Sequence, residues 1–209
     1  MSRIPAYNAA DLQPHDLLWG MSPEQLTANA PDWARERLAL GDPVVVRRDA
    51  SQPEQVAVGV RGLQRGQRFA GWMPASQVAR RVQPEQIRQL NGAGTAVQAT
   101  LDGIGQVFFG MAWGITGSHA FEALTGVKVT RAASDLDILL RLPELVSPEQ
   151  AAGWLQQLAG LPVRVDIQVE SGLGGFSLRD WAGRRGRVLL KTGTGALLTD
   201  NPWQTGGVA

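Results

Sequence analysis

Apolar and polar residues alternate most regularly in VRVDIQVE, at residues 163–170. The apolar residues of this string fall on one side of an extended chain, and Asp166 falls on the other side with its polar neighbours. The string SDLDILLRL, at residues 134–142, is almost continuously apolar after its two aspartates. Both patterns are typical of strands, so we expect two neighbouring strands of one sheet.

The first part of the chain shows a separate set of short elements. SPEQ at residues 22–25 has the form of a capping box and predicts a short helix. A second helix is expected at residues 31–40, because Gly41 follows it as a helix stop. Three apolar strings separated by turn residues predict strands at residues 43–48, 55–62 and 67–74.

The stretch from Pro74 to Gln86 interrupts these elements and contains two prolines, which places a domain boundary near residue 80. We expect an N-terminal α+β domain at residues 1–80 and a second domain at residues 81–209. In the second domain the apolar run at residues 107–115 predicts a buried strand. Helices are expected at residues 84–90, 95–101, 119–125 and 147–158. The fold class is therefore predicted to be α+β, with a mixed sheet flanked by helices.

A glycine-serine turn joins the strand that ends near Thr116 to the helix at residues 119–125. Gly117 lets the backbone approach an anion closely, and the first N–H groups of a helix point toward such an anion without partners. The Ser118 hydroxyl adds a further donor. The turn is therefore a candidate phosphate-binding site.

Asp135 and Asp137 lie two residues apart at the start of a predicted strand, so both side chains leave the backbone on the same side. Two adjacent carboxylates repel each other unless a cation lies between them, and oxygen ligands suit Mg²⁺. A pair of this kind alone is weak evidence, since a solvated strand end has the same appearance. The ordered combination with the Gly-Ser turn and with Asp166 on the next strand is a stronger indication.

Composition and charge narrow the class of protein. Hydrophobic residues make up 44% of the 209 residues and charged residues 19%, as in ordinary globular proteins. The absence of cysteine excludes disulfides, thiolate metal sites and cysteine nucleophiles. We expect a cytoplasmic protein without membrane segments, because neither a signal sequence nor a long apolar run is present. A net charge of +1 argues against a general nucleic-acid partner.

Basic residues are concentrated in one segment, between Val44 and Arg81. This segment contains seven arginines and two acidic residues. It is a candidate docking surface for an acidic partner. A general preference for arginine explains it equally well, because the chain has 18 arginines and two lysines.

The order of these motifs resembles the nucleotidyltransferase superfamily. A closer resemblance, over nearly the whole chain, is to the malonate decarboxylase holo-acyl-carrier-protein synthase family. It is carried by the strings PHDLLWG, PVVVRR, VAVGVRG, WGITGSHAFEALTG, SDLDILLR, VDIQVE and VLLKTGTGALLTDNPW. The resemblance implies a nucleotidyltransferase-like catalytic domain.

Members of that family are phosphoribosyl-dephospho-CoA transferases. The resemblance implies that the substrate is 2′-(5″-triphosphoribosyl)-3′-dephospho-CoA. It also implies that the acceptor is a serine of the malonate decarboxylase acyl carrier protein, and that pyrophosphate leaves. It places the catalytic aspartates on Asp135 and Asp137, with Gly117 and Ser118 facing phosphate. The aspartates are then expected to hold Mg²⁺, which offsets charge on the leaving group.

Three further residues receive hypothetical roles. Asp166 is either a third metal ligand or the base that accepts the serine proton, and a solvated strand aspartate is the alternative. Arg141 is a candidate phosphate ligand, with an ion pair to Glu144 as its alternative. Lys191, in VLLKTGTG, is a candidate phosphate ligand or a surface lysine at a strand end.

Two other functions stay open at this point. The metal and phosphate motifs define a donor and leave the acceptor undefined, so a nucleotidyltransferase acting on a small molecule or on RNA fits them as well. A module that binds a carrier protein or a nucleotide without catalysis is the second alternative. The low net charge disfavours RNA.

Overall fold

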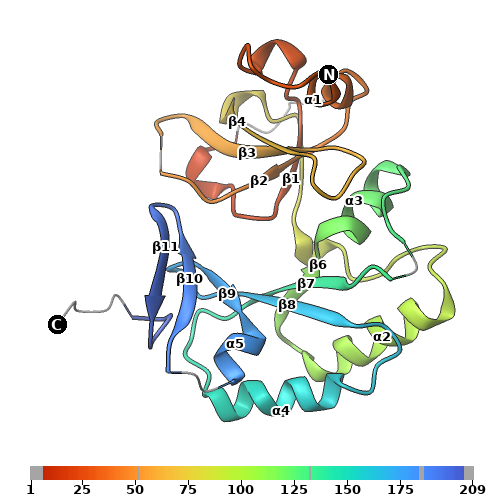
Figure 1. The fold of residues 1–209 in the computed structure, drawn as a ribbon, viewed down its shortest axis with the longest axis vertical. Coiled ribbons are helices and arrows are strands. Elements are labelled where there is room, and N and C mark those ends of the chain that lie inside the picture. The colour runs from red at the N-terminus through yellow and green to blue at the C-terminus, as the bar shows by residue number, and fades with distance from the viewer. Residues whose placement is uncertain (1–6, 51, 132, 184–185, 205–209) are drawn as a thin grey trace. The chain divides into compact units, whose positions relative to one another are not determined.

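The computed structural model describes residues 7–50, 52–131, 133–183 and 186–204 (Figure 1). The chain forms two compact units, Met1–Gln83 and Pro84–Ala209, and each unit is described by itself. The division falls three residues beyond the predicted boundary at residue 80.

The first unit is a five-stranded antiparallel sheet in the order β4-β3-β2-β1-β5. Leu18, Val58 and Met73 lie at the centre of its core, and helix α1 contributes Ala34 and Leu38. Its strands are β1 (Leu17–Trp19), β2 (Val44–Val46), β3 (Gln55–Arg61), β4 (Arg68–Pro74) and β5 (Arg80–Val82), and its helices are η1 (Ala9–Asp11), η2 (Pro23–Gln25), α1 (Asp32–Ala39) and η3 (Ala75–Gln77).

The predictions for this unit are confirmed for α1 and for strands β2, β3 and β4. The capping box at residue 22 is present, since the Ser22 N–H donates to Gln25 Oε1 at 2.6 Å, but it opens only the single 3-10 turn η2. Strands β1 and β5 were not predicted, because three residues are too few to show an alternating pattern. Strand β5 pairs with β1, which extends this unit past residue 80.

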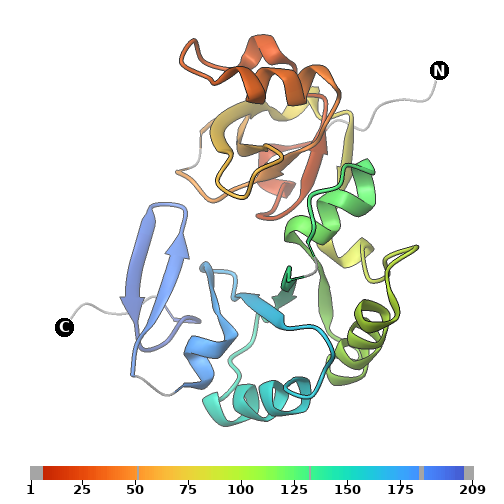
Figure 2. The ribbon, with the colours of Figure 1, turned by 45° about the vertical axis from the view of Figure 1, so that its right-hand side comes forward.

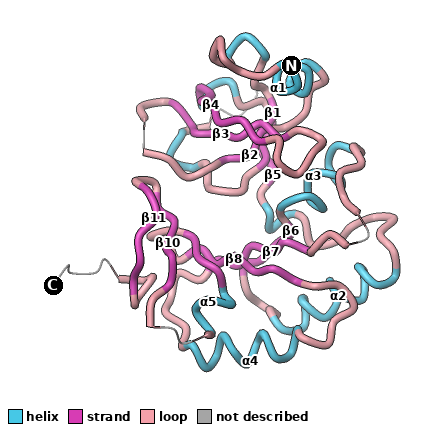
Figure 3. Tube along the Cα trace, viewed as in Figure 1, coloured by secondary structure: helices cyan, strands magenta, loops and turns pink. Residues whose placement is uncertain are grey.

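The second unit is a six-stranded mixed sheet in the order β11-β10-β9-β8-β7-β6, and its strands are drawn in magenta in Figure 3. Strands β7 and β8 run parallel, and the other neighbouring pairs run antiparallel. Its strands are β6 (Ala112–Ile115), β7 (Leu136–Arg141), β8 (Val165–Glu170), β9 (Gly175–Ser177), β10 (Val188–Thr192) and β11 (Gly195–Thr199), and its helices are η4 (Pro84–Gln86), α2 (Thr95–Val107), α3 (Gly117–Thr125), α4 (Pro148–Leu158) and α5 (Leu178–Ala182).

Helices α2, α4 and α5 cover one face of this sheet, and α3 lies at the other face (Figures 1 and 2). The core under α2 and α4 includes Phe108 and Trp154, whose rings meet edge to face with centroids 5.6 Å apart. Helix α4 begins where it was predicted, with the Gln150 N–H donating to Ser147 Oγ at 3.1 Å. The α+β fold class with a mixed sheet is confirmed.

Two predictions for this unit are wrong. The run at residues 107–115 was expected to be a single strand, but Val107 ends α2, a turn follows, and only Ala112–Ile115 is extended. A short apolar run fits a buried helix as well as a buried strand, which explains the error. The helix expected at residues 84–90 is only the 3-10 turn η4. Among the described residues, no helix is both long and apolar enough to cross a bilayer.

Candidate functional site

The Gly-Ser turn and the Asp137 carboxylate are in direct contact. Strand β6 ends at Ile115, and the backbone N–H of Thr116 donates to the Asp137 carbonyl at 2.9 Å. Gly117 then opens α3 with a left-handed φ of 63°. A Cβ atom at this position would lie 2.7 Å from Asp137 Cγ and closer still to Oδ2. Only glycine adopts this φ without strain and also leaves room for the Asp137 carboxylate.

Asp137 and Asp166 are neighbours on the sheet. They occupy paired positions of the parallel strands β7 and β8. Paired residues project from the same face and are about 4.8 Å apart between strands. The side chain of Asp166 is exposed and that of Asp137 is half-buried. The sheet therefore places one accessible carboxylate beside another that touches the Gly-Ser turn.

Asp135 lies one residue before β7 and contacts a basic side chain. Its Oδ1 is 3.6 Å from Nε of Arg164, whose side chain is 73% exposed. The backbone holds the same pair of segments together, since the Leu136 N–H donates to the Arg164 carbonyl at 2.9 Å. An exposed ion pair of this kind is worth at most about 1 kcal/mol, so the Asp135 carboxylate can exchange it for another cation.

The three predicted metal ligands thus lie on adjacent segments, but they are not already assembled. Within the part of the chain that the structure describes, no three His, Asp or Glu side chains stand close enough together to form a metal centre. The donor chemistry nevertheless fits Mg²⁺, because every group at this position offers carboxylate oxygen. The contact between Gly117 and Asp137 leaves the carboxylate beside backbone N–H groups suited to phosphate.

His119, to which the sequence assigned no role, lies one residue after the turn. Burial lowers the pKa of the imidazole below its ordinary value of 6.5, and the charge of Glu122 and a hydrogen bond with the backbone of Asp135 oppose this shift. The ring is therefore largely neutral at pH 7. The ring lies beside the segment that carries Asp135.

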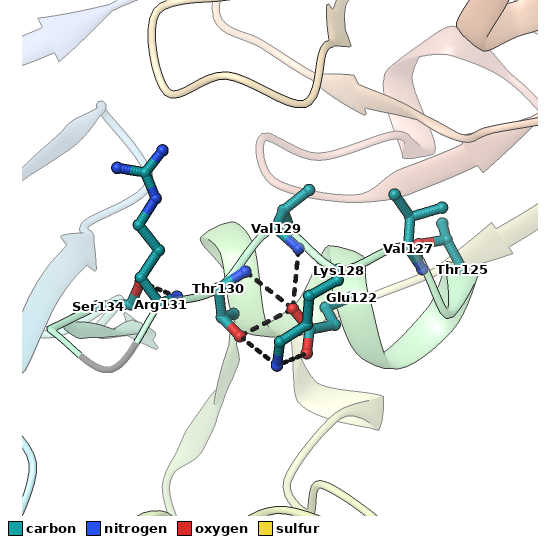
Figure 4. Close-up of polar contacts among 8 residues, drawn as sticks. All are labelled: Glu122, Thr125, Val127, Lys128, Val129, Thr130, Arg131 and Ser134. Carbon is teal, nitrogen blue, oxygen red and sulfur yellow. Dashed lines mark hydrogen bonds and ion pairs between the residues drawn. The ribbon is translucent and has the colours of Figure 1, made fainter.

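Glu122, one helical turn further along α3, binds the loop that leads to Asp135 (Figure 4). Its Oε2 accepts from the Val129 N–H at 3.0 Å and from both the N–H and the hydroxyl of Thr130 at 2.8 Å. Its Oε1 accepts from Lys128 Nζ at 2.8 Å. Burial by itself raises the pKa of Glu122, but these hydrogen bonds, with that from Lys128 the largest, lower it to about 2. No local sequence pattern indicated this role.

The structure places Arg141 and Lys191 away from the aspartates. Arg141 pairs with Glu170 across β7 and β8, and Glu170 and Lys191 are both in register with Gly175. This row lies four residues, about 13 Å, beyond the row that contains Asp137. The guanidinium of Arg141 forms an ion pair with Glu85, in place of the Glu144 partner that the sequence had suggested. Their predicted contacts with phosphate stay untested.

Several arginines of the basic segment in the first unit have structural partners. Arg81 Nε is 2.7 Å from Oδ2 of the fully buried Asp16, and Arg47 pairs with Asp49 at 2.6 Å. The guanidinium of Arg80 stacks over the Trp19 ring at 4.3 Å. The positive charge of this segment is thus partly neutralised within the unit.

Comparison with known proteins covers both units. The profile of the phosphoribosyl-dephospho-CoA transferase MdcG N-terminal domain matches residues 13–84, and that of the C-terminal domain matches residues 82–202. A phosphoribosyl-dephospho-CoA transferase of Azotobacter vinelandii is 48% identical over 204 residues, which cover 92% of this chain and 94% of the relative.

Proteins of the same name from two pseudomonads are similarly close. That of Pseudomonas putida (strain W619) is 45% identical over 91% of this chain and 95% of its own length. That of Pseudomonas aeruginosa is 43% identical over 92% of this chain and 94% of its own length. No solved structure matches. The chain therefore belongs to the phosphoribosyl-dephospho-CoA transferase family, which confirms the resemblance seen in its sequence and makes it an enzyme of the transferase class.

Proposed function

We propose that this protein transfers the phosphoribosyl-dephospho-CoA group from 2′-(5″-triphosphoribosyl)-3′-dephospho-CoA to a serine of the malonate decarboxylase acyl carrier protein. Family membership supports the nature of the transferred group. The observation that supports the location of the reaction is the contact of the Asp137 carboxylate with the Gly117 turn, with Asp166 in register beside it. A phosphate-binding turn and paired carboxylates are the components that phosphoryl transfer needs.

The proposed reaction is a substitution at the α-phosphorus. The serine oxygen forms a bond to this phosphorus, and the bond between the α-phosphorus and the bridging oxygen breaks, so pyrophosphate departs with the electron pair. The N–H groups at the start of α3 and the Ser118 hydroxyl bind phosphate oxygens. Asp135 and Asp137 hold Mg²⁺, which neutralises charge on the triphosphate when it is bound.

Asp166 is the remaining carboxylate at this edge of the sheet. Because it is exposed and adjacent to Asp137, it is accessible both to a cation and to the hydroxyl of an incoming serine. We assign it either to the metal or to the proton of the serine.

Intact-mass spectrometry tests the proposal. The carrier protein is incubated with this enzyme, Mg²⁺ and the triphosphoribosyl donor, and it should gain the mass of one phosphoribosyl-dephospho-CoA group. The Asp137→Asn variant should not produce this gain, although its thermal unfolding should match that of the wild type. An unchanged rate of transfer by Asp137→Asn would show that the site is misplaced. A wild-type enzyme that leaves the carrier unmodified would refute the acceptor.

A further inference from the structure

We propose that Glu122 is a positioning residue, which fixes the loop between α3 and β7 so that Asp135 is held at a defined place beside the Gly-Ser turn. The inference rests on the proposed function for the role of Asp135. It concerns a residue that touches neither the transferred phosphate nor the metal in that proposal. The loop in question, residues 126–134, connects the end of α3 to Asp135.

The first observation is the number and kind of bonds on one carboxylate. Glu122 accepts four hydrogen bonds of 2.8–3.0 Å, two of them from consecutive backbone N–H groups of the loop (Figure 4). Hydrogen bonds to a charged acceptor are roughly twice as strong as neutral ones. The side chain of Glu122 is 24% exposed, so water competes only partly for these donors.

The second observation is that α3 is tied to the segment around Asp135 and Asp137 at three successive positions. Thr116, at the N-cap, donates to the Asp137 carbonyl, and the His119 ring lies close enough to the backbone of Asp135 for that backbone to raise its pKa. Glu122 then bonds the loop. Glu122 completes a series whose other two members already touch the aspartates.

The third observation is that two hydrogen bonds join Arg131 to Ser134, the residue directly before Asp135. The Arg131 N–H donates to Ser134 Oγ at 2.9 Å, and the Ser134 N–H donates to the Arg131 carbonyl at 2.9 Å. This turn directly precedes Asp135. Thr130 directly precedes Arg131. By fixing Thr130, Glu122 therefore also restrains the segment that leads to Asp135.

Helix α3 does not depend on Glu122 for its own stability. Its last turn is closed by Gly126 in the left-handed conformation and by the Thr125 hydroxyl, which donates to the Phe121 carbonyl at 2.7 Å. Ala120 and Phe121 are each 1% exposed and anchor the helix in the core. Removal of the Glu122 charge should loosen the loop and leave the helix in place.

The test compares Glu122→Gln with Glu144→Gln, which removes an exposed carboxylate beyond the other end of β7. Hydrogen–deuterium exchange at residues 127–134 and Mn²⁺ binding, followed by electron paramagnetic resonance, are measured without substrate. In Glu122→Gln we expect faster exchange in this loop and a Mn²⁺ affinity about 10-fold weaker, as is typical when groups that support metal ligands are lost. The kcat for transfer should fall about 10- to 100-fold, while the KM for the donor stays within twofold.

Glu144→Gln should match the wild type in every measurement. If Glu122→Gln folds poorly, Lys128→Gln is the milder variant, since it removes one donor whose side chain is 78% exposed. Lys128→Gln should show the same faster exchange, weaker Mn²⁺ binding and lower kcat, each to a smaller extent. Normal exchange, Mn²⁺ affinity and kcat in a folded Glu122 variant would overturn the inference and leave the proposed function intact. A wild type that fails to modify the carrier, combined with the expected loop and Mn²⁺ effects, would overturn the function and support the positioning role.

Discussion

Replacement of Gly117 by alanine should introduce backbone strain and also displace the Asp137 carboxylate, and comparison with a second variant separates the two effects. The left-handed φ of 63° costs a residue with a side chain about 1 to 2 kcal/mol. The added Cβ would also lie 2.7 Å from Asp137 Cγ, whereas carbon atoms prefer about 3.5 Å or more. The Asp137 carboxylate therefore has to move by about 1 Å.

Gly126→Ala is the matched control, because it lies at the other end of the same helix. Its φ of 73° imposes the same kind of strain, but nothing lies within 4 Å of the added Cβ. Backbone strain by itself should lower the unfolding free energy of each variant by about 1 to 2 kcal/mol in urea titrations, and the contact with Asp137 adds to this loss only in Gly117→Ala. Displacement of a reacting group by about 1 Å costs on the order of 100-fold in rate, so only Gly117→Ala should show this loss.

The assay is the initial rate of carrier modification, measured by intact mass at saturating donor and Mg²⁺. A Gly117→Ala enzyme that works as fast as Gly126→Ala would refute the reasoning, because strain is then the whole effect. Rates that fall equally in both variants would lead to the same conclusion.

The remaining predictions concern charged residues. The low pKa of Glu122 in the folded state means that its stabilisation is complete above pH 4.5 and is lost as the pH falls toward 2. The difference in unfolding free energy between wild type and Glu122→Gln should thus be about 1 to 2 kcal/mol at pH 7, allowing for solvent screening, and should shrink by pH 3 in urea titrations. Arg141→Met should lower the unfolding free energy by about 2 kcal/mol, because Glu85 loses its ion-pair partner. The KM for the donor should stay unchanged, and an increased KM would instead support a role of Arg141 in binding phosphate. Lys191→Gln should alter neither quantity, and an increased KM would show that the exposed β10 lysine reaches the substrate. Arg164→Gln should change stability by less than about 0.5 kcal/mol and strengthen Mn²⁺ binding, since it frees the neighbouring aspartate, and weaker binding would contradict this.

Much of the local structure was predictable because its causes lie within a few residues of one another. The capping serine at residue 147 and the left-handed glycine at residue 126 mark helix ends through bonds to the adjacent turn. The alternation in β8 and the apolar run in β7 reflect which side of each strand is buried. Where the local pattern was ambiguous, at residues 107–115, the prediction failed.

Strands β9 and β11 were not predicted, β10 was anticipated only as a strand end near Lys191, and the role of Glu122 was not predicted. Strand β9 has three residues, and β11 is exposed over most of its length, so neither shows a clear burial pattern. The partners of Glu122 lie six to eight residues further along the chain, in a loop without a repeating pattern. Their approach depends on how the loop folds back over α3.

The sequence by itself determined the kinds of elements, the order of the Gly-Ser turn and the aspartates, and the family. Only the tertiary structure decided which of these groups meet. The parallel register of β7 and β8 places Asp166 beside Asp137, although the two residues are 29 positions apart along the chain. Arg141 follows Asp137 by only four positions, but the extended strand β7 puts about 13 Å between them. Strand pairing depends on the free energy of packing the whole sheet against its helices. No short segment of the chain contains the residues that determine this free energy.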